Sequence, residues 1–416
     1  MQRKVVFAIL ALALVLGTFG ALVLTACGSD TATTDSRDAS ASSSPMPEAT
    51  GEPLKIGFNE GFTGFMAVDA QLTEHGIKTA LAEVNNQWMG RPIEYFKADN
   101  ASDPVQAVDK ARQLVENNKI QVMLGPIFSP SNAAVTDYLG KGGGGIPSIS
   151  IFGQPSDNLK TGNNLSFIPA GMFSMEGYLL GKYCVETLGY KTANAISLED
   201  TTGHELMKGF QVAFEEGGGK IVSNQFVPID TVDFSSYLTT LKEADCTYNW
   251  IFGNGTGPFI KQYHDYGLTA PLVMTMADDL QEPVMQELGD LSLDIIGSDH
   301  YLSTVDNPAN NAFVALYQKL YPDELPNMDS YGGYTAVMMF LKAVEATGGD
   351  TSPDALKKVM ATMTWDTPIG PVTMSPYDSV FIGTADFYIG KTQLVDGNYR
   401  WMPVHTFEQV LFKNPW

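Results

Sequence analysis

Short apolar segments alternate with amphipathic helical segments from Leu54 onward, and this order constrains the fold more than any other feature of the chain. The apolar run at 54–58 predicts a strand, and apolar residues at helical spacing over 77–84 predict a helix after it. Further strands are predicted at 93–98, 120–125 and 146–152. Such alternation is typical of a parallel sheet covered by helices, so we expect an α/β fold.

A second set of strands and helices, of similar length, begins near Phe173. A helix over 206–214 should end at Gly217, because glycine readily adopts the backbone conformation that stops a helix. The strands of this set are predicted at 193–198, 221–227, 249–253 and 272–276. A chain of 416 residues is too long for one hydrophobic core, so we expect two α/β lobes.

Local signals mark helix starts and one turn. Asp103-Pro104 and Ser129-Pro130 each place a capping side chain before a proline at the first helical position. The glycine run at 142–145 precedes a predicted strand and not a helix. We therefore interpret it as a permissive turn and not as a phosphate-binding loop.

The first 27 residues have the pattern of a bacterial export signal. Arg3 and Lys4 precede an almost wholly apolar stretch, and the run Leu-Thr-Ala-Cys that ends at Cys27 resembles a lipobox, in which the cysteine is lipid-modified. We expect 1–26 to be a signal peptide and Cys27 to begin the mature protein. A membrane-spanning anchor is the alternative, because the apolar stretch approaches the ~20 residues that a spanning helix needs. No cluster of stop-transfer charges follows it.

The stretch 27–52 is rich in serine and threonine and nearly lacks large apolar residues. Such a segment cannot build a core, so we predict a disordered tether. The protein is then expected outside the cytoplasm, in the periplasm or on the surface of a bacterial cell. It would contact the membrane only through its lipid.

Charge and cysteine content narrow the partners and the redox chemistry. A formal net charge of −22 repels phosphate backbones, so we expect no binding to nucleic acid. If Cys27 carries lipid, Cys184 and Cys246 remain. In an oxidising compartment these two form either a disulfide or two separately buried thiols, and their spacing does not decide between the two.

The chain lacks the usual sequence patterns of enzymes and metal sites. Its five histidines form no close pair and no cluster with cysteines, and neither a Gly-x-Ser-x-Gly elbow nor a phosphate-loop motif occurs. His204, near Asp200 and Thr202, comes nearest to a nucleophile set, but a helix start explains it. We expect no catalytic residue, no metal and no cofactor.

Six short motifs occur in a characteristic order. They are Ala-Asp-Asn-Ala-Ser-Asp-Pro-Val-Gln-Ala-Val at 98–108, Ile-Gln-Val-Met-Leu-Gly-Pro-Ile-Phe-Ser at 120–129, Asp-Phe-Ser at 233–235, Asn-Trp-Ile-Phe-Gly at 249–253, Tyr-Thr-Ala at 334–336 and Ile-Gly-Pro at 369–371. In this order the chain resembles the leucine/isoleucine/valine-binding protein family. The resemblance runs from about Leu54 to at least Phe387.

The resemblance implies a type I periplasmic-binding fold, in which two Rossmann-like lobes with parallel sheets are joined by three crossovers and the ligand lies in the cleft. It places one lobe at 53–170 plus 301–385 and the other at 171–300 plus 386–416. The implied function is capture of a small solute and its delivery to an ABC permease in the membrane, by a protein expected to be monomeric. A ligand sensor that signals to a membrane partner is an alternative, and a surface-anchored hydrolase is a weaker one.

Residues at strand ends in the first lobe are expected to bind a carboxylate of the ligand. Ser129 offers a hydroxyl and free N–H groups at a positive helix end, and it matches a family position that contacts the carboxylate. A routine helix cap is the alternative. The segment of Ile151, Phe152 and Gly153 matches one that donates backbone N–H groups to the same carboxylate. Gly153 stands where the family usually has a hydroxyl, and Phe152 is either a pocket wall or a core residue.

Other candidates face the opposite side of the expected cleft. Thr202 stands where the family often has tyrosine. Asp278 or Asp279 aligns near the acidic partner of an α-ammonium group, although a solvated turn is the alternative. Asn254 is a further candidate on this side. Asp69, which belongs to the first lobe, is another candidate for facing the ligand. These departures argue against branched-chain amino acids and favour another amino acid or a related small organic acid or amide.

Overall fold

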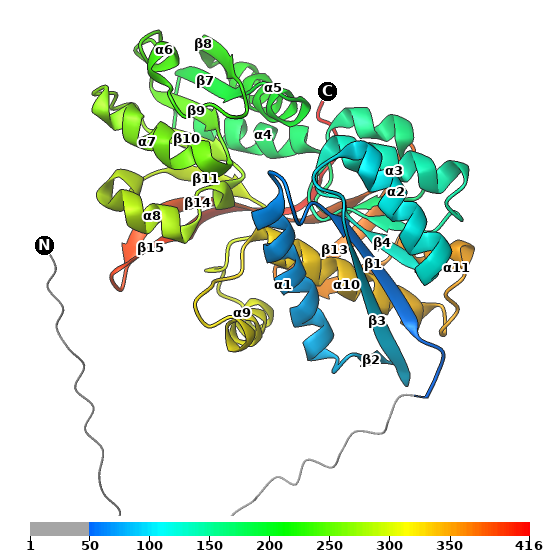
Figure 1. The fold of residues 1–416 in the computed structure, drawn as a ribbon. Helices are drawn as coiled ribbons and strands as arrows, with labels where there is room; N and C mark the ends of the chain where they lie inside the picture. The colour runs from blue at the N-terminus through cyan, green and yellow to red at the C-terminus, as the bar shows by residue number, and fades with distance from the viewer. Residues whose placement is uncertain (1–49) are drawn as a thin grey trace, which may run out of the picture. The chain divides into compact units, whose positions relative to one another are not determined.

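Parallel strands form two stretches of one sheet (Figure 1). The computed structural model describes residues 50–416. The first stretch contains β1 (Leu54–Glu60), β3 (Arg91–Asp99), β4 (Val122–Leu124), β5 (Ser148–Ile149) and β6 (Ser166–Ile168), with β2 (Gln87–Trp88) antiparallel at its edge. The second contains β7 (Thr192–Leu198), β8 (Lys220–Val227), β9 (Cys246–Trp250), β10 (Leu272–Thr275) and β11 (Ile296–Asp299). This architecture confirms the predicted α/β class.

The long strand β14 (Val380–Val395) joins the two stretches. Its first residues pair in parallel with β6, from Val380 opposite Ser166 to Ile382 opposite Ile168. Its later residues pair antiparallel with β11, from Asp299 opposite Tyr388 to Ile296 opposite Lys391. The carboxyl ends of β6 and β11 therefore face each other across the middle of β14. Loops that follow the strands of both stretches are brought to the same place.

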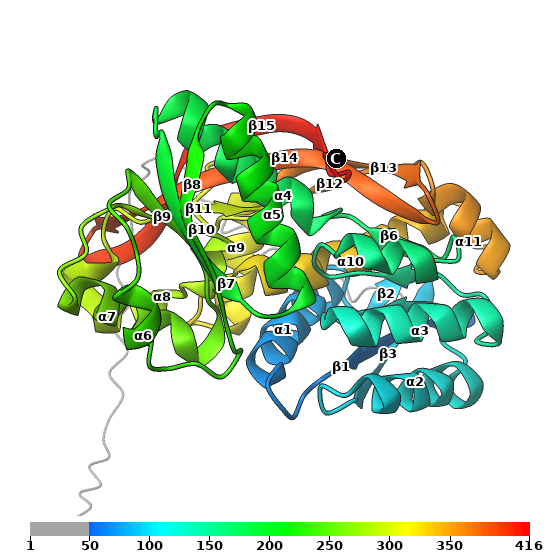
Figure 2. The same cartoon turned by 90° about the horizontal axis from the view of Figure 1, so that it is seen from above.

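Three further strands accompany β14. β12 (Thr364–Thr367) pairs antiparallel with β13 (Gly370–Tyr377), and β13 pairs in turn with β14. β15 (Asn398–Leu411) runs antiparallel beside β14 for most of its length, as Figure 2 shows. Their ladder has register shifts between Ala385 and Phe387 and between Ile389 and Gly390, close to where the two stretches meet. Such irregularities bend a strand.

Helices connect and cover the strands. They are α1 (Ala67–Glu83), α2 (Pro104–Gln113), α3 (Ser129–Lys141), α4 (Phe173–Lys182), α5 (Thr201–Glu216), α6 (Ser235–Leu238), α7 (Thr256–Asp265), α8 (Glu282–Leu288), α9 (Pro308–Leu320), α10 (Met328–Ala346) and α11 (Pro353–Met360). Single helical turns lie at Leu114–Asn118, Ser156–Thr161, Tyr183–Thr187, Gly253–Gly255, Ala277–Asp279 and Gly289–Ser292. Among residues 50–416 no helix is both long and apolar enough to cross a membrane.

The chain passes between the two stretches three times. It leaves the first after β6 and leaves the second after β11, and α10 then returns to pack against α1. β14 and β15 make the third connection, because they extend along both stretches. Three connections agree with the predicted fold, while the lobe boundaries at 170, 300 and 385 stay a prediction. The signal peptide, Cys27 and nearly all of the predicted tether lie outside the described residues.

Most of the local sequence signals act as predicted. Asp103 caps α2, because its Oδ1 accepts a hydrogen bond from Gln106 N at 2.8 Å, and Pro104 is the first helical residue. α5 ends before Gly217, and Gly144 and Gly145 adopt positive φ in the turn before β5. Cys184 and Cys246 are both buried free thiols in the structure. One prediction about a helix start is wrong, and it concerns Ser129 as described below.

Helices α1 and α10 touch through backbone atoms, and glycine makes this contact possible. A Cβ on Gly76 would lie 1.8 Å from the carbonyl oxygen of Ser330, and a Cβ on Gly333 would lie 2.3 Å from that of Thr73. Backbone atoms cannot rotate away as a side chain can, so a larger residue would push the helices apart. Asp69 and Asp329 lie at the starts of these two helices.

We expect Gly76→Ala to lower the free energy of unfolding by about 1–3 kcal/mol, the usual cost of forcing extra volume into a packed interior. Urea denaturation of the variant and the parent protein measures the difference. Gly257→Ala, in helix α7, is the matched control, because its nearest contact would be a Val284 methyl group at 3.3 Å. Equal destabilisation by both changes would contradict the close helix contact.

Candidate functional site

A pocket lies where the carboxyl ends of the two parallel stretches meet. Its walls come from loops and helix starts that follow β1, β4, β5, β6, β7, β8, β9 and β10, and from the first turn of α10. It has a volume of about 70 Å³. The residues that line it are Phe65, Met66, Asp69, Ile127, Phe128, Ser129, Phe152, Phe173, Asp200, Thr202, Ile229, Trp250, Phe252, Met276, Asp278, Asp279, Gln281 and Asp329. In open α/β folds ligands bind at the carboxyl ends of strands, so this is the position expected for a binding site.

The structure brings together six of the nine residues predicted to bind ligand. The six that line the pocket are Asp69, Ser129, Phe152, Thr202, Asp278 and Asp279. Asn254 does not, since it is exposed in the helical turn Gly253–Gly255. Ile151 and Gly153 flank Phe152 but are not part of the wall.

Packing explains the glycine where the family usually has a hydroxyl. A Cβ on Gly153 would lie 3.0 Å from the ring of Phe173, which is 3% exposed and lines the pocket. The small residue therefore makes room for an aromatic wall. Phe152 is 8% exposed, and it is both a core residue and part of the pocket wall.

Ser129 is not the cap of helix α3. The helix starts at Ser129 itself, its N-cap position is Phe128, and no side chain caps it. The N-cap is therefore one residue earlier than predicted. Serine before proline is a frequent capping pair, but here Phe128 is the last residue before the helix (φ −59°, ψ 117°). Ser129 is 6% exposed, and among the described hydrogen bonds none uses its hydroxyl. Its Oγ and the first N–H groups of a 13-residue helix remain available at the pocket wall.

Hydrogen bonds hold Asp278 and Asp279 in place, so these residues do not form a solvated turn. Asp279 Oδ2 accepts a hydrogen bond from Trp250 Nε1 at 3.0 Å. Asp278 Oδ2 accepts one from the backbone N–H of Met328 at 3.2 Å, and the Asp278 N–H donates to Asp299 Oδ2 at 3.0 Å. These bonds connect the loop after β10 to the start of α10.

Carboxyl groups around the pocket are crowded, and their proton affinities change accordingly. Burial, reinforced by the charge of Asp278, raises the pKa of Asp69 to about 7. Burial and neighbouring carboxylates also raise the pKa values of Asp279 and Asp329 well above the usual range. Behind the wall, burial raises the pKa of Glu176 to about 8, although Glu176 Oε1 accepts a hydrogen bond from Met276 N at 2.7 Å.

A larger hollow of about 410 Å³ adjoins this pocket and shares Asp278 and Gln281 with it. It is lined by the loop at 323–327, by residues of α8 and by the start of β15. Asp278 is the one predicted ligand residue that it contains. The smaller pocket is the better candidate site, because it lies at the strand ends of both stretches and gathers six of the predicted residues.

Several residues of the pocket wall were not predicted from the sequence. Trp250 and Phe252 end the strand at 246–250 or follow it, so the rule of strand ends could have found them. Phe128 directly precedes Ser129 and could have been found in the same way. Asp329 gives no such signal, because it lies in the first turn of a helix far along the chain. Only the contact of α10 with α1 brings it to the pocket.

The chain is similar to known proteins over most of its length. A family model described as periplasmic binding protein matches residues 53–396. The Leu/Ile/Val-binding protein homolog 6 of Brucella abortus (strain 2308) is 28% identical over 372 residues, which cover 87% of this chain and 93% of the relative.

Solved structures agree with this match. An ABC transporter substrate-binding protein from Sphaerobacter thermophilus is 25% identical, with a TM-score of 0.80, and the alignment covers 87% of this chain and 99% of the other. A solute-binding protein of an ABC transporter from R. palustris, solved with 4-hydroxybenzoate, is 25% identical with a TM-score of 0.78, covering 86% and 98%. These relatives are substrate-binding proteins of transporters and not enzymes. The chain belongs to the leucine/isoleucine/valine-binding family of type I periplasmic binding proteins, the solute-binding components of ABC transporters.

Proposed function

We propose that this protein is the lipid-anchored, extracytoplasmic solute-binding component of an ABC importer, and that it captures an amino acid or a related small organic acid or amide. The observation that carries the proposal is the pocket itself. It takes Asp69, Ser129 and Phe152 from the first stretch of the sheet and Thr202, Asp278 and Asp279 from the second. A solute bound there would touch both stretches at once.

The two stretches act as lobes that close on the solute, with boundaries near 170, 300 and 385. A ligand favours the closed state only by the amount by which it binds that state more tightly than the open one. Phe65 and Ile229 form the mouth of the pocket, because they line it although they are 50% and 38% exposed. Closure would cover these apolar side chains.

A zwitterionic solute fits the two sides of the pocket. Ser129 and the positive end of α3 suit a carboxylate, and Asp278 and Asp279 suit an ammonium group. The lipid on Cys27 would keep the loaded protein near the permease.

Thermal unfolding of residues 50–416 in the presence of amino acids, amides and aromatic acids tests whether the pocket binds a solute. A ligand present at 100 times its dissociation constant should stabilise the protein by about 2.7 kcal/mol. A broad panel without any shift would argue against the transport function.

Ser129→Ala should weaken binding of a carboxylate-bearing ligand by about 1–3 kcal/mol, because the ligand would lose one charge-assisted hydrogen bond in a buried site. Isothermal titration measures the change. Ser236→Ala, an exposed serine in α6, is the control and should leave affinity unchanged. Parent-like affinity of the Ser129 variant would remove this hydroxyl from the site.

Cys27→Ser should abolish labelling of the protein by a radioactive fatty acid, because it removes the thiol that would carry the lipid. Ser29→Ala, two residues away, should keep the labelling. Autoradiography of the immunoprecipitated protein measures it. A parent protein without any label would favour the spanning anchor over the lipid.

A further inference from the structure

The pocket carries an excess of acidic groups. Five of its lining residues are aspartates, and within the described residues no lysine, arginine or histidine lines it. They come from four different places: Asp69 from α1, Asp200 from the N-cap of α5, Asp278 and Asp279 from the turn after β10, and Asp329 from α10. One ammonium group of a zwitterionic amino acid needs far less negative charge than this.

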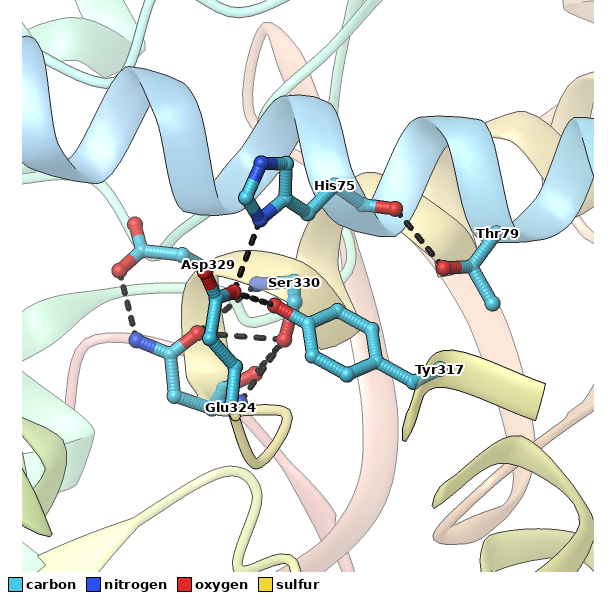
Figure 3. Close-up of polar contacts among 7 residues, drawn as sticks. His75, Thr79, Tyr317, Glu324, Asp329 and Ser330 are labelled. Atoms are coloured by element: carbon cyan, nitrogen blue, oxygen red, sulfur yellow. Dashed lines mark hydrogen bonds and ion pairs between the residues drawn. The ribbon is translucent and has the colours of Figure 1, made fainter. Parts of the chain in front are cut away.

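Asp329 has an oxygen without any partner. The residue is 2% exposed, and its Oδ2 accepts a hydrogen bond from Asn327 Nδ2 at 2.9 Å, whereas Oδ1 is buried and unpaired (Figure 3). The side chain is not a mobile tip, because Asn327 and Ser330 form a capping box that fixes the first turn of α10. A buried acceptor without a donor costs free energy, so a ligand that supplies the donor would gain from it.

Within the described part of the chain, the other two carboxylates, Asp278 and Asp279, receive hydrogen bonds from neutral groups. Asp279 receives a hydrogen bond from the indole of Trp250, and Asp278 receives one from a backbone N–H. Behind the wall, His300 Nε2 lies 3.8 Å from Glu176 Oε2. Burial lowers the pKa of His300 to about 3, so this ring is uncharged at neutral pH. No basic side chain among the described residues that line the pocket therefore balances its carboxyl groups.

The aromatic walls add an attraction for positive charge. Trp250 and Phe252 lie with their ring centroids 5.3 Å apart, and Phe65 and Phe128 make an edge-to-face pair at 5.0 Å. All four rings line the pocket. Aromatic faces attract ammonium groups, and the attraction strengthens when water is excluded. Among the described residues no group of His, Cys, Asp and Glu is arranged to hold a metal ion.

We propose that the solute carries a net positive charge, as a basic amino acid does, and that its extra ammonium group binds among Asp69, Asp278 and Asp329. This inference rests on the proposed function and narrows its ligand class. The carboxylate of such a solute would face Ser129. A branched-chain amino acid has one ammonium group and an aromatic acid has none, so both would leave part of this acidic cluster without a charged partner.

Binding of a cation should depend on pH in a defined direction. Asp69 faces Asp278 and Glu60, and Asp329 faces Asp69, Asp278 and Asp279, while Glu176 and Asp299 add charge behind Asp278. Because burial raises the pKa of Asp69 to about 7, protons occupy part of this cluster below that pH. A cation must displace them, so its affinity should rise between pH 5 and pH 8. The affinity of an anionic ligand should fall over the same range.

Isothermal titration of the soluble form that lacks 1–26 and carries Cys27→Ser tests the proposal, with L-lysine, L-ornithine, L-leucine and 4-hydroxybenzoate as probes. L-lysine or L-ornithine should bind at least tenfold more tightly than the other two and should bind more tightly at pH 8 than at pH 5. Asp329→Asn should weaken the basic amino acid at least tenfold. Asp109→Asn, an aspartate whose side chain is 67% exposed, is the control for net charge and should change affinity less than twofold.

The outcomes separate this inference from the proposed function. Tighter binding of L-leucine or 4-hydroxybenzoate than of both basic amino acids, or an affinity for the cation that falls as pH rises, would overturn the charge assignment and leave the solute-binding function intact. Parent-like affinity of a folded Asp329→Asn variant, verified by thermal unfolding, would overturn it as well. Absence of any heat of binding for all four probes would count against both proposals.

Discussion

The pairing of β14 with both parallel stretches is the constraint on which the rest of the structure depends. β6 pairs with its first residues in the same direction, and β11 pairs with its later residues in the opposite direction. Because of this register, the strands of the two stretches run toward each other and not side by side. The carboxyl ends of β6 and β11 therefore lie near the segment between Ile382 and Tyr388 of β14, and the pocket is lined by loops that follow strands of both stretches.

Sequence patterns predicted the elements better than the site. Asp103 and Gly217 act through neighbours within a few residues, so their signals could be identified without the fold. The cap of α3 was misplaced by one residue because serine and proline fit two adjacent registers equally well. Asp278 and Asp279 were identified through the family resemblance, because they align near the family's acidic partner of an α-ammonium group. Asp329 was missed because its place in the pocket depends on the close packing of α10 on α1, which a local pattern does not encode.

The carboxyl groups around the pocket are both crowded and buried. Like charges at short range oppose ionisation, and burial opposes it further, so the protein must hold protons or bind counter-charge there. Donors from Trp250 and Met328 relieve part of this opposition for Asp279 and Asp278. The glycine at 153 contributes on the other side, since it gives up a polar contact and admits the ring of Phe173. The pocket wall thus combines carboxyl groups with aromatic side chains.

The chain enters the folded body at the end of β1 that is far from the pocket. The backbone N–H groups of Thr50 and Gly51 both donate to the carbonyl of Gly90 at 3.1 Å, beside the turn between β2 and β3. This point is next to the amino end of β1, a strand of 7 residues, and hence roughly 23 Å from the strand's pocket end at ~3.3 Å per residue. The residues before Thr50 therefore join the folded body at the end of β1 that is opposite to the pocket. Changes to the chain before Thr50 are made far from the residues that line the pocket.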